Sequence, residues 1–324
     1  MAGAKENVVI SSGDCSLTLL PALGGKISSL RAGAHELLQA PLKPLAPRTQ
    51  TMAFSASDAS GWDECLPSVG ECIIETETGN ASIPDHGDLW RLEWEVLDIA
   101  ADSATMRATC FSLPLEVTRT LLLSTTGSGW LLRAMYTVAN RGNGFVPWSW
   151  AAHPLFSAQA GDRIVLPASI QTLKVEGSAG NRLGQNGDTT QWPIAKLADG
   201  SQTDLSVARN IESGIGDKLF AQPDANDAWC SLERPAIGLR LTVRFDPVLT
   251  PYIGLWICYG GWPDEAGAKQ MCVAMEPTTA PVDSLAKIGP WSRILAPGET
   301  FTWPMELHID RITELTEISE FSAQ

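Results

Sequence analysis

Hydrophobic and polar residues alternate, or form short apolar runs, over much of the chain beyond residue 90. Turn-forming residues separate these stretches, for example at 102–103 and 126–129. Short strands between regular turn signals are typical of a β-sandwich or barrel. The expected strands cover residues 7–10, 16–20, 91–100, 104–111, 115–124, 130–140, 229–233, 238–245, 252–259, 271–276 and 300–309.

Helical periodicity is nearly absent, and only residues 311–321 suggest a helix, a weak one. The 28 glycines and 21 prolines among 324 residues fit a turn-rich β protein. Residues 40–60 are expected to form a long loop, because Pro41, Pro44 and Pro47 interrupt small and polar residues. Long loops in compact domains are often functional. Residues 161–190 are also polar and glycine-rich.

The chain contains no internal repeat and no linker-like segment, so we expect a single domain over residues 1–324. A hydrophobic share of 44% is enough to bury a large core. The pattern therefore predicts an all-β fold class.

The formal net charge of −14 disfavours nucleic acid and anionic membrane surfaces as partners. It also weighs mildly against a heavily phosphorylated substrate. The seven cysteines are scattered without a Cys-x-x-Cys pair, which argues against a zinc knuckle and indicates free thiols in a reducing compartment. The N-terminus lacks the apolar core of a signal peptide, and no run of eighteen apolar residues could span a membrane. We expect a cytoplasmic protein.

Four segments could carry chemistry, namely residues 85–88, the surroundings of His153, residues 216–220 and residues 274–279. His153 lies among apolar and aromatic residues, and aromatic faces beside an imidazole suit a sugar. Glu276 ends an apolar strand, where a carboxylate needs a partner to offset its desolvation. Simpler readings stay open, because His153 could be a core histidine and Asp217 a turn residue.

Five motifs occur in an order and spacing that resemble the aldose 1-epimerase (galactose mutarotase-like) superfamily. They are Gly-Trp-Asp-Glu-Cys-Leu-Pro at 61–67, Pro-Asp-His-Gly at 84–87, His-Pro-Leu-Phe at 153–156, Asp-Lys-Leu-Phe at 217–220 and Glu-Pro-Thr-Thr at 276–279. The resemblance covers about residues 8–310. It implies a large antiparallel β-supersandwich whose concave face binds a sugar.

The resemblance also implies roles for individual residues. Glu276 matches the general base that takes the proton of the C1 hydroxyl, and His153 matches the general acid that protonates the ring oxygen. His86 matches a second imidazole that holds the ring oxygen or a neighbouring hydroxyl, and Asp217 a carboxylate that binds sugar hydroxyls. The family also uses an arginine upstream of the His-Gly motif, for which Arg48 is the nearest candidate here.

Asp85, Trp150 and Trp256 complete the expected sugar-binding set, the two tryptophans as stacking faces. The chain departs from better-known mutarotases, because residues 86–88 read His-Gly-Asp rather than His-Gly-Gly. Residues 153–156 likewise read His-Pro-Leu-Phe where a His-x-Tyr-Phe-Asn pattern is common. We therefore expect a substrate pocket that differs in detail.

The expected activity is interconversion of the α and β anomers of a sugar, without cofactor or metal. Opening a hemiacetal removes one proton and adds another on the same ring, which a carboxylate and an imidazolium can do. Three alternatives remain open. They are a sugar-binding protein without turnover, a hexose-6-phosphate 1-epimerase, and a metal-dependent isomerase that uses His86, His153 and Glu276 as ligands.

Overall fold

The structure is a computed structural model that describes residues 7–77 and 79–312. Strands and isolated bridges hold 51% of the described residues and short helices 7%, which confirms the all-β prediction. The helix expected at 311–321 lies outside the described residues apart from its first two, of which Arg311 ends a strand. No helix in the described part of the chain is long and apolar enough to cross a membrane.

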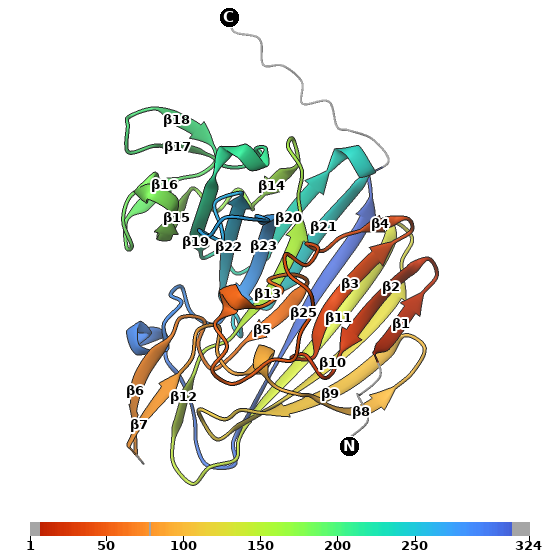
Figure 1. The fold of residues 1–324 in the computed structure, drawn as a ribbon, viewed down its shortest axis with the longest axis vertical. Coiled ribbons are helices and arrows are strands. Elements are labelled where there is room, and N and C mark those ends of the chain that lie inside the picture. The colour runs from red at the N-terminus through yellow and green to blue at the C-terminus, as the bar shows by residue number, and fades with distance from the viewer. Residues whose placement is uncertain (1–6, 78, 313–324) are drawn as a thin grey trace, which may run out of the picture.

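Two large antiparallel sheets form the body of the molecule (Figure 1). The eleven strands of the first are β1 (Val8–Ser12), β2 (Cys15–Leu20), β3 (Lys26–Ala32), β4 (His35–Glu36), β5 (Trp62–Cys65), β13 (Ala151–Ser157), β15 (Thr172–Ser178), β16 (Thr189–Gln191), β19 (Ile215–Ala221), β22 (Tyr252–Tyr259) and β23 (Met271–Thr278). Their order is β1-β2-β3-β5-β13-β23-β22-β19-β15-β16, with β4 beside β3.

The second sheet has eight strands in the order β14-β20-β21-β25-β11-β10-β9-β8. They are β8 (Glu95–Ile99), β9 (Ser103–Thr109), β10 (Leu115–Thr125), β11 (Gly129–Asn140), β14 (Arg163–Val165), β20 (Trp229–Arg234), β21 (Leu239–Phe245) and β25 (Thr300–Arg311). One continuous hydrophobic core contains buried residues from both sheets. The strand pattern therefore reflects two sheets that each bury one face against the other.

Short elements connect and flank the sheets. Three two-stranded sheets pair β6 (Cys72–Thr76) with β7 (Gly79–Ile83), β12 (Val146–Trp148) with β24 (Arg293–Leu295), and β17 (Ile194–Lys196) with β18 (Gln202–Asp204). The 3₁₀ turns are η1 (Phe54–Ala56), η2 (Leu89–Arg91), η3 (Ala179–Asn181), η4 (Ile211–Ser213), η5 (Pro235–Ile237), η6 (Leu285–Lys287) and η7 (Gly289–Trp291). All seven cysteines are unpaired, as the sequence predicted.

The expected strands match well wherever the apolar pattern is strong. The strand predicted at 252–259 is β22 with the same bounds. The polar stretch 161–190, for which the pattern predicted no strand, contains β14 and β15 and begins β16. Only Leu173 and Val175 are buried in β15, so its alternation is too short to stand out from the sequence. The loop expected at 40–60 contains no strand and a single turn, η1.

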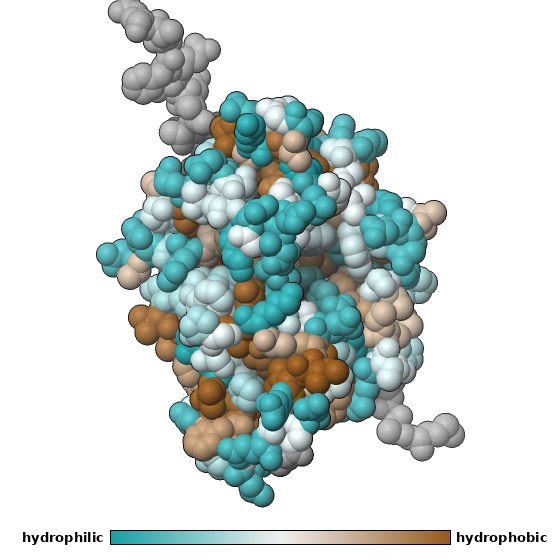
Figure 2. Space-filling model, turned by 90° about the vertical axis from the view of Figure 1, so that its left-hand side faces the viewer, coloured by the Kyte–Doolittle hydropathy of each residue, from teal (hydrophilic) through white to brown (hydrophobic). Residues whose placement is uncertain are grey.

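Figure 2 shows the side of the molecule on which β6, β7 and β12 lie in Figure 1. Most of this surface is hydrophilic, and hydrophobic residues gather in its lower half. Exposed hydrophobic side chains here include Ile73 of β6, Phe145 just before β12 and Ile294 of β24. None of the three lines the cavity described below.

A buried ion pair joins the two sheets. Arg119 of β10 donates to Glu64 of β5 at 3.0 Å, and both side chains are almost fully excluded from solvent. The hydroxyl of Tyr136 donates to the same Glu64 oxygen at 2.9 Å, and Trp150 Nε1 donates to the other at 3.0 Å. Glu64 therefore has partners on both oxygens, as a buried charge requires.

We predict that Arg119→Met lowers the free energy of unfolding by about 3–5 kcal/mol, because it leaves the Glu64 charge buried without its counter-charge. Chemical denaturation of the purified variant measures the loss. The control is Arg133→Met, which removes a solvent-exposed ion pair with Glu306 and should cost less than about 1 kcal/mol. Equal losses in the two variants would contradict the prediction.

Candidate active site

A cavity of about 420 Å³ opens on the first sheet, a size suited to a small ligand such as a monosaccharide. Aromatic, imidazole and carboxylate groups converge on it, together with one ammonium group. Its lining consists of Phe54, Ser55, Val69, Gly70, Asp85, His86, His153, Lys218, Trp256, Trp262, Gln270 and Asp283. Asp85, His86, His153 and Trp256 are thus at the cavity, as the sequence predicted.

Strand register brings Glu276, which is fully buried and not among the lining residues, next to His153, which lines the cavity. β13 and β23 are neighbours, and the pairs Ala151↔Thr278 and Leu155↔Ala274 place His153 opposite Glu276. On the other side of Glu276, β22 presents Gly254 as its register partner. A Cβ atom at Gly254 would lie only 3.2 Å from Glu276 Oε2, so this glycine makes room for the carboxylate.

Glu276 is fully buried, and its two carboxylate oxygens have different surroundings. Oε2 accepts a short hydrogen bond from the Lys218 ammonium group. Oε1 lies 3.8 Å from Nε2 of His153 and has no hydrogen-bond partner. Burial raises the pKa of the Glu276 carboxyl, while the Lys218 charge opposes that rise. Lys218 therefore fixes Oε2, and Oε1 is left without a hydrogen-bond partner.

The imidazole of His153 is buried in surroundings that disfavour its charged form. Burial is the main cause that lowers its pKa well below the ordinary 6.5, and the positive charges of His86, Lys218 and Lys26 act in the same direction. Its Nδ1 has no hydrogen-bond partner. Burial therefore prevails over the nearby Glu276 carboxylate, and the free protein holds a neutral His153 at pH 7.

His86 enters the cavity from the turn after β7. Its φ of 60° lies in the left-handed region, and Gly87 follows with a φ of 66°. A Cβ at Gly87 would lie 2.3 Å from the Leu66 carbonyl oxygen, so only glycine fits there. Nδ1 of His86 lies 3.0 Å from Asp85 Oδ1. The turn therefore places an imidazole and a carboxylate side by side.

Phe54 forms a wall of the cavity beside both histidines, whose own rings meet edge-on at 5.2 Å between centroids. Its ring stacks on His86 at 3.9 Å between centroids and meets His153 edge-on at 5.6 Å. Arg91 ties this wall to the His86 turn, because its guanidinium donates to the Met52 carbonyl at 2.7 Å and to the Asp85 carbonyl at 2.7 Å. The long loop and the histidine turn are thus held by one side chain.

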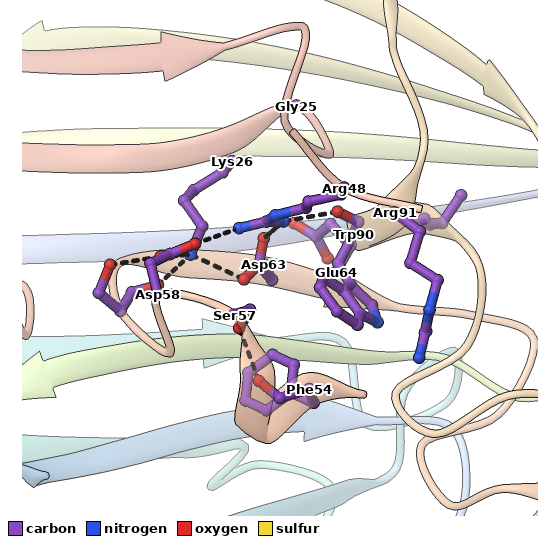
Figure 3. A network of polar contacts seen from close by, with 12 residues as sticks. Gly25, Lys26, Arg48, Phe54, Ser57, Asp58, Asp63, Glu64, Trp90 and Arg91 are labelled. Atoms are coloured by element: carbon purple, nitrogen blue, oxygen red, sulfur yellow. Dashed lines mark hydrogen bonds and ion pairs between the residues drawn. The ribbon is translucent and has the colours of Figure 1, made fainter. Parts of the chain in front are cut away.

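A buried network of four charges holds the long loop against the sheet (Figure 3). Lys26 lies 3.0 Å from Asp58 and 2.8 Å from Asp63. Arg48 lies 2.8 Å from Asp58 and 3.1 Å from Asp63. Burial favours the neutral form of Asp58, but Lys26 and Arg48 outweigh it and lower the pKa of its carboxyl to about 2. The two cations and two carboxylates balance each other.

Three residues expected to bind sugar lie outside the cavity lining. Arg48 belongs to the network of four charges, where Asp58 and Asp63 bind its guanidinium group. Its side chain is only 1% exposed. Trp150 lies in the core, 5.0 Å from Trp303 between ring centroids, with its Nε1 bound to Glu64. Asp217 is fully buried and accepts hydrogen bonds from Arg182 and Ser178.

Asp217 departs from the expectation in a second way, because it lies inside β19 rather than in a turn. Neighbouring residues of a strand point to opposite faces of the sheet. Lys218 faces the cavity, so Asp217 faces away from it. The motif at 217–220 therefore contributes its lysine to the cavity and its aspartate to the opposite side.

Sequence reasoning missed Phe54, Lys218, Gln270 and Asp283 as lining residues. Gln270 accepts a hydrogen bond from Trp256 Nε1 at 2.9 Å and donates to the Ala59 carbonyl at 3.1 Å, which fixes the Trp256 ring. Lys218 belongs to the motif at 217–220, and the alternation of side chains along a strand could have identified it as a residue that faces the cavity. Phe54 lies in the long loop, whose path the sequence does not reveal.

A metal site is not formed by these residues. Within the described ranges, no group of three or more His, Cys, Asp or Glu side chains is placed to hold a metal ion. One of the two carboxylate oxygens of Glu276, Oε2, is bound to the Lys218 ammonium group. The donor set therefore fits proton transfer better than metal coordination.

Solved structures identify the fold, although no family model and no curated protein matches the sequence. The chain resembles the Slr1438 protein from Synechocystis sp. PCC 6803 with a TM-score of 0.69 and 18% identity, over 94% of this chain and 96% of that one. A galactose mutarotase-like protein from Lactobacillus casei ATCC 334 gives a TM-score of 0.61 and 17% identity, over 94% and 100% of the chains.

The GalM/aldose epimerase homologue from C. elegans gives a TM-score of 0.66 and 12% identity, over 95% of this chain and 99% of that one. These likenesses show that the chain has the galactose mutarotase-like fold. The fold expected from the five sequence motifs is therefore confirmed.

We predict that His153 stays neutral at pH 6.5, its ordinary midpoint, because burial lowers its pKa. Titration of the ring nitrogens by ¹⁵N NMR measures this, with the His153 signals assigned by their loss in His153→Asn. Half-protonation near pH 6.5 would show that the imidazole is solvated rather than buried.

Proposed function

We propose that this chain is an aldose 1-epimerase that interconverts the α and β anomers of a free sugar. The observation that carries the proposal is the unpartnered Oε1 of buried Glu276, 3.8 Å from Nε2 of His153, which itself lines a cavity of monosaccharide size. A carboxylate oxygen left without a donor in a desolvated site is costly for stability. A sugar hydroxyl placed there would satisfy it.

The proton transfers follow from these positions. Glu276 Oε1 takes the proton of the C1 hydroxyl, the electron pair left on that oxygen forms the carbonyl, and the bond from C1 to the ring oxygen breaks. The ring oxygen takes a proton from the His153 imidazolium. Rotation about the C1–C2 bond and the reverse steps close the other anomer. Each acid or base role contributes roughly 10²–10⁴-fold.

Burial opposes both charged forms that this reaction needs. It raises the pKa of Glu276 and lowers that of His153. The free protein therefore carries a carboxylate and an imidazolium together in only a fraction of molecules, and that fraction limits the rate. When two such groups must both be charged, the pH of maximal rate lies midway between their two apparent pKa values.

The aromatic walls suit a sugar that presents its C–H faces. Phe54, Trp256 and Trp262 line the cavity, and aromatic faces bind the apolar faces of sugar rings. A sugar-binding protein without turnover would use the same walls. It would have no need of an unpartnered carboxylate beside an imidazole, which favours the enzyme.

We predict that Glu276→Gln and His153→Asn each lower the rate of anomer exchange at least about 100-fold, because each removes one proton-transfer group. Polarimetry or NMR exchange spectroscopy over a panel of free aldoses measures the rate. The control is Ser169→Ala, a residue outside the cavity lining. Near-wild-type exchange by either purified, folded variant would remove that residue from the mechanism.

We also predict that a 6-phosphate group on the substrate lowers kcat/KM about tenfold or more. Two carboxylates, Asp85 and Asp283, line the cavity with one ammonium group, that of Lys218, and no arginine is among the lining residues in the described part of the chain. Like charges repel in such a site. The measurement compares an aldose with its 6-phosphate, and a preference for the phosphate would favour the hexose-6-phosphate 1-epimerase alternative.

A further inference from the structure

Lys218 is the only cationic residue among those that line the cavity, as far as the described ranges show. It projects from β19 toward β23, and its ammonium group binds Glu276 Oε2. A second carboxylate oxygen, Asp283 Oδ1, lies 3.7 Å from the same nitrogen. Burial lowers the pKa of Lys218, but Glu276 and Asp283 outweigh burial and raise it above its ordinary value. Lys218 is therefore a permanent ammonium ion at neutral pH.

This contact makes the two oxygens of Glu276 unequal. Oε2 is held between Lys218 and the space above Gly254, where any side chain would crowd it. Oε1 is turned toward His153. Without the ammonium group, nothing in the described structure would fix the rotation of the carboxylate, since Oε1 has no hydrogen-bond partner of its own.

We propose that Lys218 is the positioning residue of Glu276, and that Oε1 is the oxygen that accepts the substrate proton. This inference rests on the proposed aldose 1-epimerase function. Lys218 holds Oε2, keeps the carboxylate charged and turns Oε1 toward the space between Glu276 and His153. It forms no covalent bond with the substrate, because an ammonium ion held by two carboxylates has no free electron pair for attack on an aldehyde.

The groups around Glu276 determine how the protonation of its carboxyl depends on pH. Lys218 and Asp283 face it from β19 and from the segment after β23, and His153 and His86 face it from β13 and the turn after β7. Two thiols complete the set, Cys65 of β5 and Cys272 of β23 itself. Burial raises the pKa of both thiols, so they stay uncharged. Lys218 is therefore the dominant stabiliser of the Glu276 charge.

Replacement of Lys218 by methionine keeps the length of the side chain and removes its charge. The loss of an adjacent opposite charge raises a carboxyl pKa by roughly 1–3 units. At pH 7 we expect kcat to fall about 10- to 100-fold in Lys218→Met, with little change in KM. The pH of maximal rate should move upward, because the removed charge lowered the pKa of both Glu276 and His153.

Two variants separate charge from geometry. Lys218→Arg keeps the charge and changes its shape, so it should restore the Glu276 titration more fully than the rate. Asp283→Asn removes a negative charge that raises the pKa of Glu276, so the titration should move in the opposite direction, to lower pH. The control is Lys287→Met, an exposed lysine whose loss should change neither quantity.

Titration of the Glu276 carboxyl by ¹³C NMR, assigned by its loss in Glu276→Gln, measures the charge effect without any assay of activity. If the wild type exchanges no anomers, the proposed function fails, and this titration still tests the role of Lys218. If the wild type is active but Lys218→Met leaves the rate and the Glu276 titration unchanged, the inference about Lys218 is wrong while the proposed function stands.

Discussion

The cavity depends on a buried network of ion pairs between the long loop and the first sheet. Lys26 and Asp63 belong to β3 and β5, whereas Arg48 and Asp58 belong to the long loop. Charges are removed from water only where opposite charges and hydrogen bonds replace the solvent, and here each carboxylate meets both cations. The network therefore fixes the loop that supplies Phe54, and Phe54 in turn packs against both histidines.

The sequence predicts the parts of this site that a short motif or an apolar run marks. Glu276 ends a predicted apolar strand and His153 lies among apolar residues. The strand that carries His153, β13, is not among the predicted strands, and the register of the folded sheet brings the two side chains together. The prediction that Trp150 stacks on a sugar is wrong, because a core tryptophan and a stacking tryptophan both have apolar neighbours in the sequence. Arg48 was placed in the cavity because its distance along the chain from the His-Gly motif says nothing of its partners, which are the carboxylates of Asp58 and Asp63.

Burial acts on the site in two directions. It isolates His153 and Glu276 from water, which strengthens every electrostatic contact between them and a ligand. It also lowers the population of the charged forms that proton transfer requires. Lys218 offsets this second effect at Glu276 alone, since its positive charge disfavours an imidazolium at His153. The arrangement thus favours a charged base more strongly than a charged acid.

The pairing of β13 with β23 joins segments that are far apart in the chain. Contacts of such long sequence separation form late, because the loop that connects them must first be ordered. A partly folded chain could contain most of the local hairpins and still lack any apposition of His153 and Glu276. Sugar binding at this cavity would consequently report on completion of the whole molecule, and its recovery after denaturation would lag behind the recovery of secondary structure.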